Sequence, residues 1–145
     1  MRTLVLATAL LAAAPALAGL TAEQEKQLAE ANYVYVQSER KSGEWSKPAE
    51  IWFFVDGGTL YVGTKPESWR VKRIKAGRTK ARVAIGKADG PAFEATSAVV
   101  KDPGLEEKMF AAYAKKYPEG WKKFEDAFRQ GFKTGDRVLV AYTPH

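Results

Sequence analysis

The hydrophobic pattern is clearest in the middle of the chain. Two short apolar and aromatic runs, residues 51–55 and 60–62, flank Asp56-Gly57-Gly58. Runs of this length that are rich in β-branched and aromatic residues favour strands. Asp-Gly and Gly-Gly pairs supply the positive φ angles that tight turns between antiparallel strands require. The pattern therefore predicts a β-hairpin over residues 51–62.

A short helix is predicted directly after this hairpin. The segment Thr64-Lys65-Pro66-Glu67 matches a capping box, in which a threonine and a glutamate three residues later bond to each other's backbone N–H groups. The helix would start at this capping box, with Pro66 just inside it, and would include residues 69–75, with Val71 and Ile74 facing the core. Gly77 stands where a left-handed C-terminal cap is expected. A further strand is predicted over residues 81–85.

The rest of the chain alternates between strand-like and helix-like patterns. We expect strands at residues 33–36, 93–101 and 136–143, and helices at residues 21–31, from 105 to a break at Pro118, and after Pro118. In the last helix Trp121, Phe124 and Phe128 recur at helical spacing, which favours a core-facing surface. The prediction is an α+β domain with about six mostly antiparallel strands and three to four helices.

The first 18 residues have the composition of a secretory signal peptide. Arg2 precedes an apolar run at residues 4–14, and Pro15-Ala16-Leu17-Ala18 fits a small-residue cleavage site. The alternative is a buried N-terminal helix. Because there is no twin arginine, we expect export by general secretion, to the periplasm or the medium. Residues 19–145 would then form the mature domain.

Composition argues against several classes of function. Cleavage would leave 127 residues and lower the formal net charge from +6 to +5, because the leader contains one arginine and no acid. The chain has no cysteine, and its single histidine is the last residue, His145, so disulfides, thiolate metal sites and histidine-based triads are not expected. For an exported chain of this moderate charge we expect no nucleic-acid partner, and the apolar segments are too short for a membrane span.

Four carboxylates lie on or near predicted strands, but their spacing singles out no acid–base pair: Glu50, Asp56, Glu94 and Asp136.

The basic turn and helix after the hairpin carry the candidate binding chemistry. Hydroxyls and cations gather there: Thr64, Lys65, Ser68, Arg70, Lys72 and Arg73. A helix start with free backbone N–H groups suits a phosphate, and Arg70 and Arg73 share one helix face at a spacing of three. The alternative is a solvated basic helix face whose hydroxyls serve only as caps.

The same stretch resembles the split β-barrel proteins that bind flavins or deazaflavins, the pyridoxamine-phosphate-oxidase-like family. The resemblance is carried by Pro48-x-x-Ile51-Trp52-Phe53, by the hairpin ending in Thr64 and by Ser68-x-Arg70-Val71-Lys72-Arg73-Ile74, and it extends over residues 33–144. It implies a split β-barrel, a homodimer with the ligand at its interface, and FMN as cofactor, with F420 as the alternative. If the protein is an enzyme, the resemblance implies a flavin- or F420-dependent oxidoreductase. Trp52 would line the ring system, and residues 64–73, with Arg70 as the leading cation, would hold the phosphate.

Two further hypotheses stay open beside the redox enzyme. An exported protein meets no ready NAD(P)H pool, and a chain exported unfolded must acquire its flavin afterwards. The barrel would then be a non-enzymatic module that binds another phosphorylated or aromatic small molecule. The third hypothesis is a structural or surface-associating protein that uses its positive charge. The chain also departs from the family pattern, because Arg70 stands where lysine is usual and no arginine directly precedes Thr143-Pro144.

Overall fold

In the computed structural model, which describes residues 19–145, the run predicted as one strand over residues 51–55 is divided into two. The strand β2 (Ala49–Ile51) ends before Trp52, and β3 (Phe54–Asp56) begins after Phe53. β2 pairs with β1 (Val34–Ser38), whereas β3 pairs with β4 (Thr59–Thr64). The prediction of one continuous strand is therefore wrong. The predicted signal peptide, residues 1–18, lies outside the described residues.

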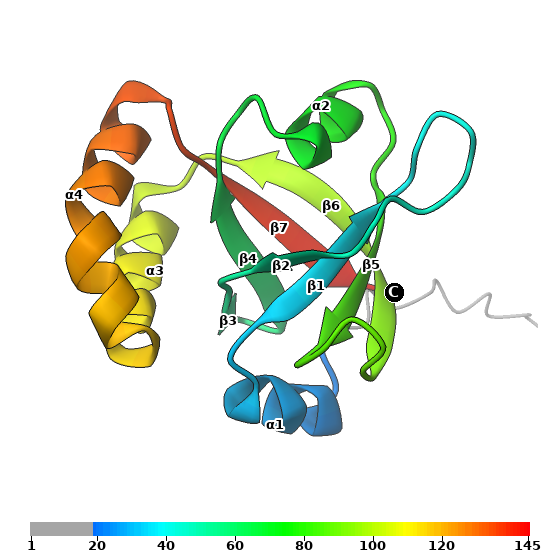
Figure 1. Ribbon diagram of the computed structural model, residues 1–145, viewed down its shortest axis with the longest axis horizontal. Coiled ribbons are helices and arrows are strands. Elements are labelled where there is room, and N and C mark those ends of the chain that lie inside the picture. Colours follow the sequence, from blue (N-terminus) through cyan, green and yellow to red (C-terminus); the bar gives the residue numbers. More distant parts are fainter. Residues whose placement is uncertain (1–18) are drawn as a thin grey trace, which may run out of the picture.

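All the strands of the described residues belong to one sheet, which also contains β5 (Lys80–Ile85), β6 (Ala92–Val100) and β7 (Val138–Pro144). The order is β2-β1-β5-β6-β7-β4-β3, and every neighbouring pair is antiparallel. β2 and β3 occupy the two edges, although only Trp52 and Phe53 separate them in the chain. A sheet whose edges are joined so closely must curl, and Figure 1 shows the resulting barrel. The predicted α+β split barrel is confirmed, and the described part of the chain contributes seven strands in place of about six.

Within residues 19–145, four helices surround the sheet: α1 (Ala22–Glu30), α2 (Trp69–Lys75), α3 (Pro103–Lys116) and α4 (Pro118–Thr134). In Figure 1, α1 and α2 lie at opposite ends of the barrel, and α3 and α4 pack together on one flank. The first helix begins as predicted, with Thr21 and Gln24 in a reciprocal capping box. Within residues 19–145, no helix is both long enough and apolar enough to cross a membrane.

The central hairpin turn agrees with the sequence prediction. Asp56 pairs with Thr59, so Gly57 and Gly58 alone form the turn. Their φ angles are 56° and 76°, which is the geometry of a two-residue type I′ turn. The turn therefore matches the right-handed twist of the strands that it joins.

The predicted start of the next helix is wrong. β4 continues to Thr64 because this residue pairs with Val138 of β7, so its backbone belongs to the sheet and not to a helix cap. α2 begins only at Trp69, and the Ser68 side chain before it makes no capping hydrogen bond. The end of the helix is as predicted, with Gly77 in the left-handed conformation at φ 84°.

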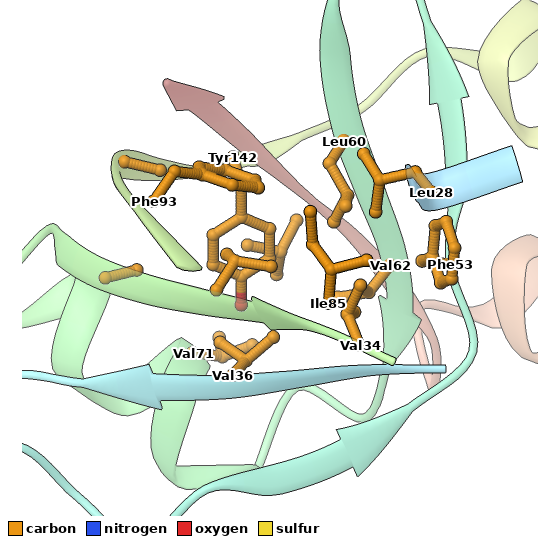
Figure 2. Packing of buried hydrophobic residues seen from close by; sticks show 14 residues of the cluster. Leu28, Val34, Val36, Phe53, Leu60, Val62, Val71, Ile85, Phe93 and Tyr142 are labelled. Carbon is orange, nitrogen blue, oxygen red and sulfur yellow. The ribbon is translucent and has the colours of Figure 1, made fainter. Parts of the chain in front are cut away.

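Two hydrophobic cores lie on opposite sides of the sheet. The interior core fills the barrel and includes Leu28 of α1 and Val71 of α2, so both end-covering helices contribute to it (Figure 2). The flank core lies under α3 and α4 and is mainly aromatic. Of the predicted stripe on α4, Trp121 and Phe128 are buried in the flank core, whereas Phe124 is 47% exposed.

Two tyrosines hold the backbone of the β2–β3 crossover, Tyr113 in the last turn of α3 and Tyr117 directly after this helix. The Tyr113 hydroxyl donates a hydrogen bond to the Trp52 carbonyl at 3.1 Å. The Tyr117 hydroxyl accepts from the Phe53 N–H at 3.3 Å and donates to the Asn32 carbonyl at 2.7 Å. Burial raises the pKa of both hydroxyls, that of Tyr117 to about 12, so both stay protonated at neutral pH. These hydroxyls bond to backbone groups that lie outside β2 and β3.

Replacing Tyr117 by phenylalanine tests the importance of this crossover. The substitution removes one oxygen and leaves the buried Phe53 N–H without its partner, so we expect a loss of about 1–3 kcal/mol in the free energy of unfolding. Urea denaturation measures this loss. Tyr61→Phe is the matched control, because no hydrogen bond of its hydroxyl occurs within residues 19–145. Equal stability of the two variants would contradict the role assigned to Tyr117.

Candidate functional site

An aromatic cleft lies where the β2–β3 crossover and the end of β4 face α4. Its volume is about 610 Å³, within the range of small-molecule sites. The residues that line it include both aromatic and polar side chains: Tyr33, Glu50, Ile51, Trp52, Gly63, Thr64, Lys65, Glu67, Ser68, Phe124, Phe128 and Arg137. The cleft therefore combines stacking surfaces with charged and hydroxyl groups.

Trp52 is the central aromatic residue of the cleft. Its indole stacks on Tyr117, with ring centroids 4.5 Å apart, and lies nearly parallel to Phe128 at 6.2 Å. Gly120 of α4 permits this position, because a Cβ there would lie 2.5 Å from the indole Cζ2. Tyr33 is also parallel to Tyr117, at 6.1 Å. Aromatic faces held in one orientation are suited to stacking against a planar ligand.

Arg137 is a cation of the cleft that the sequence analysis missed. Its guanidinium lies 4.7 Å from the centroid of the Phe128 ring. Its stem packs against Gly131, which leaves no room for a Cβ, and its backbone N–H donates to the Gly131 carbonyl at 3.0 Å. Nothing in the local sequence marks this arginine, because it precedes the last strand and is far along the chain from the basic turn. The packing of α4 on the barrel brings it to the same cleft as Lys65.

A second pocket, which we call the basic pocket, adjoins the aromatic cleft. Its volume is about 380 Å³, and Ser68 lines both pockets. Its lining includes four cations and no carboxylate: Arg40, Lys47, Arg70 and Arg73. Burial lowers the pKa of Arg73, and the nearby charges of Arg40 and Arg78 lower it further. Cations crowded together in this way favour the binding of an anion.

The structure divides the predicted site residues between these two pockets. Four of them line the aromatic cleft: Trp52, Thr64, Lys65 and Ser68. Arg70 and Arg73 line the basic pocket, in agreement with the prediction that they share one helix face. Lys72 lines neither pocket, and its ammonium lies over the Trp69 ring, 4.9 Å from the centroid.

Hydrogen bonds hold the two arginines of the basic pocket in place. Arg70 Nη1 donates to Thr64 Oγ1 at 2.9 Å, and Arg73 Nη1 donates to Ser38 Oγ at 2.8 Å. A guanidinium has five N–H donors, so each arginine keeps several for a ligand. Because α2 has only seven residues and no side-chain cap, we assign the anion-binding capacity to the guanidinium groups and not to the helix start.

The four carboxylates that lie on or near the predicted strands do not form an acid–base pair. Glu50 accepts a hydrogen bond from the Tyr35 hydroxyl, and Asp56 forms an ion pair with Lys108 at 3.2 Å. Glu94 and Asp136 are exposed on the surface. In the described part of the chain, no group of three histidine, cysteine or acidic side chains is placed to hold a metal ion.

Solved structures match the chain in three dimensions, although no protein-family model and no curated protein sequence matches it. A candidate pyridoxamine 5′-phosphate oxidase from Listeria innocua gives a TM-score of 0.61 at 16% identity, covering 85% of this chain and 91% of that chain. An F420 reductase gives 0.54 at 20% identity, covering 83% and 92%. HutZ, the haem storage protein from Vibrio cholerae, gives 0.58 at 12% identity, covering 88% and 92%.

At these identities the likeness shows the fold. The resemblance to the split β-barrel proteins is therefore confirmed as a shared fold, and it extends over most of the chain. The names of the matched proteins point to different ligands, a pyridoxamine phosphate, F420 and haem. The fold alone accordingly does not select one of them for this chain.

The contact between Gly120 and Trp52 predicts an unusual response to a glycine-to-alanine substitution. In a helix this change normally stabilises by up to about 1 kcal/mol. Here we expect Gly120→Ala to destabilise the protein, because the new Cβ would displace the indole. In the Trp52→Ala background the same change should become stabilising, which a double-mutant cycle by urea denaturation would measure. Stabilisation in both backgrounds would show that the indole moves away freely.

Proposed function

We propose that the protein binds FMN, or a related flavin or deazaflavin such as F420, with the ring system in the aromatic cleft and the phosphate in the basic pocket. The observation that carries this proposal is that the two pockets adjoin at Ser68. A planar ring joined by a short chain to a phosphate needs a stacking surface beside a cationic pocket. Pyridoxal-type phosphates share this chemistry but have a much smaller ring.

The aromatic cleft supports the ring half of the proposal. Trp52 lines the cleft and is fixed by its packing against Tyr117 and the α4 backbone, so little side-chain freedom would be lost when a ring stacks there. Lys65 and Arg137 place positive charge in the same cleft, where they would orient the polar edge of a ring. A bound flavin would supply hydride or electron transfer, while the chain binds it, orients it and excludes water.

The basic pocket supports the phosphate half. Arg70 and Arg73 are positioned in advance by Thr64 and Ser38, so binding would not have to order two flexible side chains. Arginine also matches phosphate geometry, because two N–H groups of its planar fork bond to two oxygens at once. Arg70 takes the place of the lysine that is usual in the pattern, and it keeps the charge that the phosphate requires.

The redox enzyme is the first form of this proposal, and the alternative is a non-enzymatic module that binds another phosphorylated or aromatic small molecule. Both use the same two pockets, and neither needs the acid–base pair that the described residues lack. We also propose that the protein is exported, on the strength of its leader sequence, and that it forms a homodimer, as the resemblance implies. The visible absorption spectrum of protein purified from its native compartment distinguishes the two forms, because only the first requires a retained flavin or deazaflavin.

Titration with FMN tests the assignment of the phosphate site. Replacing Arg70 and Arg73 by alanine removes two charge-assisted contacts of about 1.5 kcal/mol or more each, so we expect the affinity to fall about 100-fold or more. Quenching of FMN fluorescence measures it, and thermal melts check that the variant is folded. Lys75→Ala is the control, because it removes an exposed cation of the same helix that lines neither pocket.

Unchanged FMN affinity in the double variant would contradict the phosphate assignment. No saturable FMN binding by the wild-type protein, together with strongly salt-dependent adsorption to anionic surfaces, would favour the third hypothesis of a surface-associating protein.

The mass of the protein in its native host tests the proposed export. We expect the intact mass in the exported fraction to correspond to residues 19–145, because the leader would be cleaved after Ala18. Mass spectrometry after cell fractionation measures this. A chain that retains Met1 and stays with the cytoplasmic fraction would contradict the proposal.

A further inference from the structure

A separate groove of about 640 Å³ lies between α1, β3 and α3, and it shares no lining residue with the aromatic cleft. We call it the lysine groove. Its lining is mostly apolar, with charged residues only from the two helices: Glu25, Leu28, Ala29, Phe53, Phe54, Val55, Ala112, Lys115 and Lys116. Leu28 and Phe53 also belong to the interior core, and Figure 2 shows them at the same edge of it.

Lys116 is the feature of this groove that the fold does not explain. Its ammonium lies 3.6 Å from the centroid of the Phe53 ring and 3.4 Å from the Leu28 carbonyl. It forms no ion pair within residues 19–145. Burial lowers its pKa to about 8, which means that the charged form is poorly compensated there. A half-buried ammonium with aromatic and carbonyl contacts but no carboxylate is suited to an external anion.

The charges around Lys116 leave room for such an anion. From α1, Glu25 lines the groove but is exposed, and from α3, Lys115 adds a second exposed cation. Asp56, at the end of β3, is already paired with Lys108. The groove thus contains one partly desolvated cation beside an apolar floor. This arrangement is complementary to a molecule with a single anionic end and an apolar remainder.

We propose that the lysine groove binds a carboxylate amphiphile of the fatty-acid type, with its carboxylate paired to the Lys116 ammonium and its alkyl chain against Leu28, Phe54 and Val55. This site is independent of the proposed function, because it lies between other elements and uses none of the residues assigned to the flavin or its phosphate. Its test therefore fails or succeeds separately from the FMN titration.

Calorimetric titration with dodecanoate, below its micelle concentration, measures the binding. We expect saturable binding of one molecule per chain and weaker binding of dodecanol, which has the same chain without the charge. Lys116→Met should lower the dodecanoate affinity about tenfold or more, since it removes a charge-assisted contact in a partly desolvated site. Lys115→Met, which removes the neighbouring exposed cation, should change the affinity less than about twofold, as expected for a solvated charge.

A second pair of variants keeps Lys116 in place. Ala112 lines the groove one helical turn before Lys116, so Ala112→Glu supplies an internal carboxylate to the ammonium and fills the groove. We expect it to abolish dodecanoate binding in a folded protein. Ala111→Glu adds the same charge one position earlier on the exposed surface of α3, outside the groove, and should leave the binding intact.

The pH dependence gives an independent readout. Dodecanoate would bind the charged form of Lys116, so its affinity should be constant from about pH 6.5 to pH 7.5 and then fall by up to about tenfold per pH unit above pH 8. Lys116→Met should lose this dependence. Absence of saturable dodecanoate binding, equal affinity in Lys116→Met, or unimpaired binding in folded Ala112→Glu would each overturn the proposal.

Discussion

The crossover from β2 to β3 is the constraint on which the rest of the structure depends. Two residues join strands that lie at opposite edges of the sheet, so the sheet has to curl until those edges meet. The crossover backbone cannot continue either ladder, and its hydrogen bonds go to the hydroxyls of Tyr113 and Tyr117. Tyr113 also accepts from the Gly63 N–H of β4, which ties this strand as well as the crossover to α3. The packing of α3 on the flank therefore stabilises the crossover that closes the barrel.

The same two residues supply a surface to each of the two candidate sites. Trp52 lies outside the barrel, where it stacks between the flank aromatics and becomes a wall of the aromatic cleft. Phe53 is only 1% exposed and packs in the interior core, with its ring against the Lys116 ammonium. Consecutive residues of an extended backbone point to opposite sides, and here the two sides belong to different sites. One irregularity in the sheet therefore helps to shape both.

The sequence identified most of the candidate site but not how it is divided. Trp52 and the basic turn were singled out from aromatic character, hydroxyls and charge. All of these residues except Lys72 line the aromatic cleft or the basic pocket. The predicted helix start at Thr64 did not form, because Thr64 is paired with β7 and the helix begins at Trp69. Arg137 was missed, since only the contact of α4 with the barrel brings it to the cleft. Lys116 has no local signal either, because its burial depends on α1.

By itself, the sequence determined those features whose causes lie within a few residues. The turn at Gly57 and Gly58, the cap at Thr21 and the helix end at Gly77 follow from local backbone preferences and short hydrogen bonds. The tertiary structure alone decided where the run at residues 51–55 breaks, how far β4 extends and which cations share a pocket. These outcomes depend on partners that are distant in the chain, and a local pattern contains no information about which partner the backbone will meet.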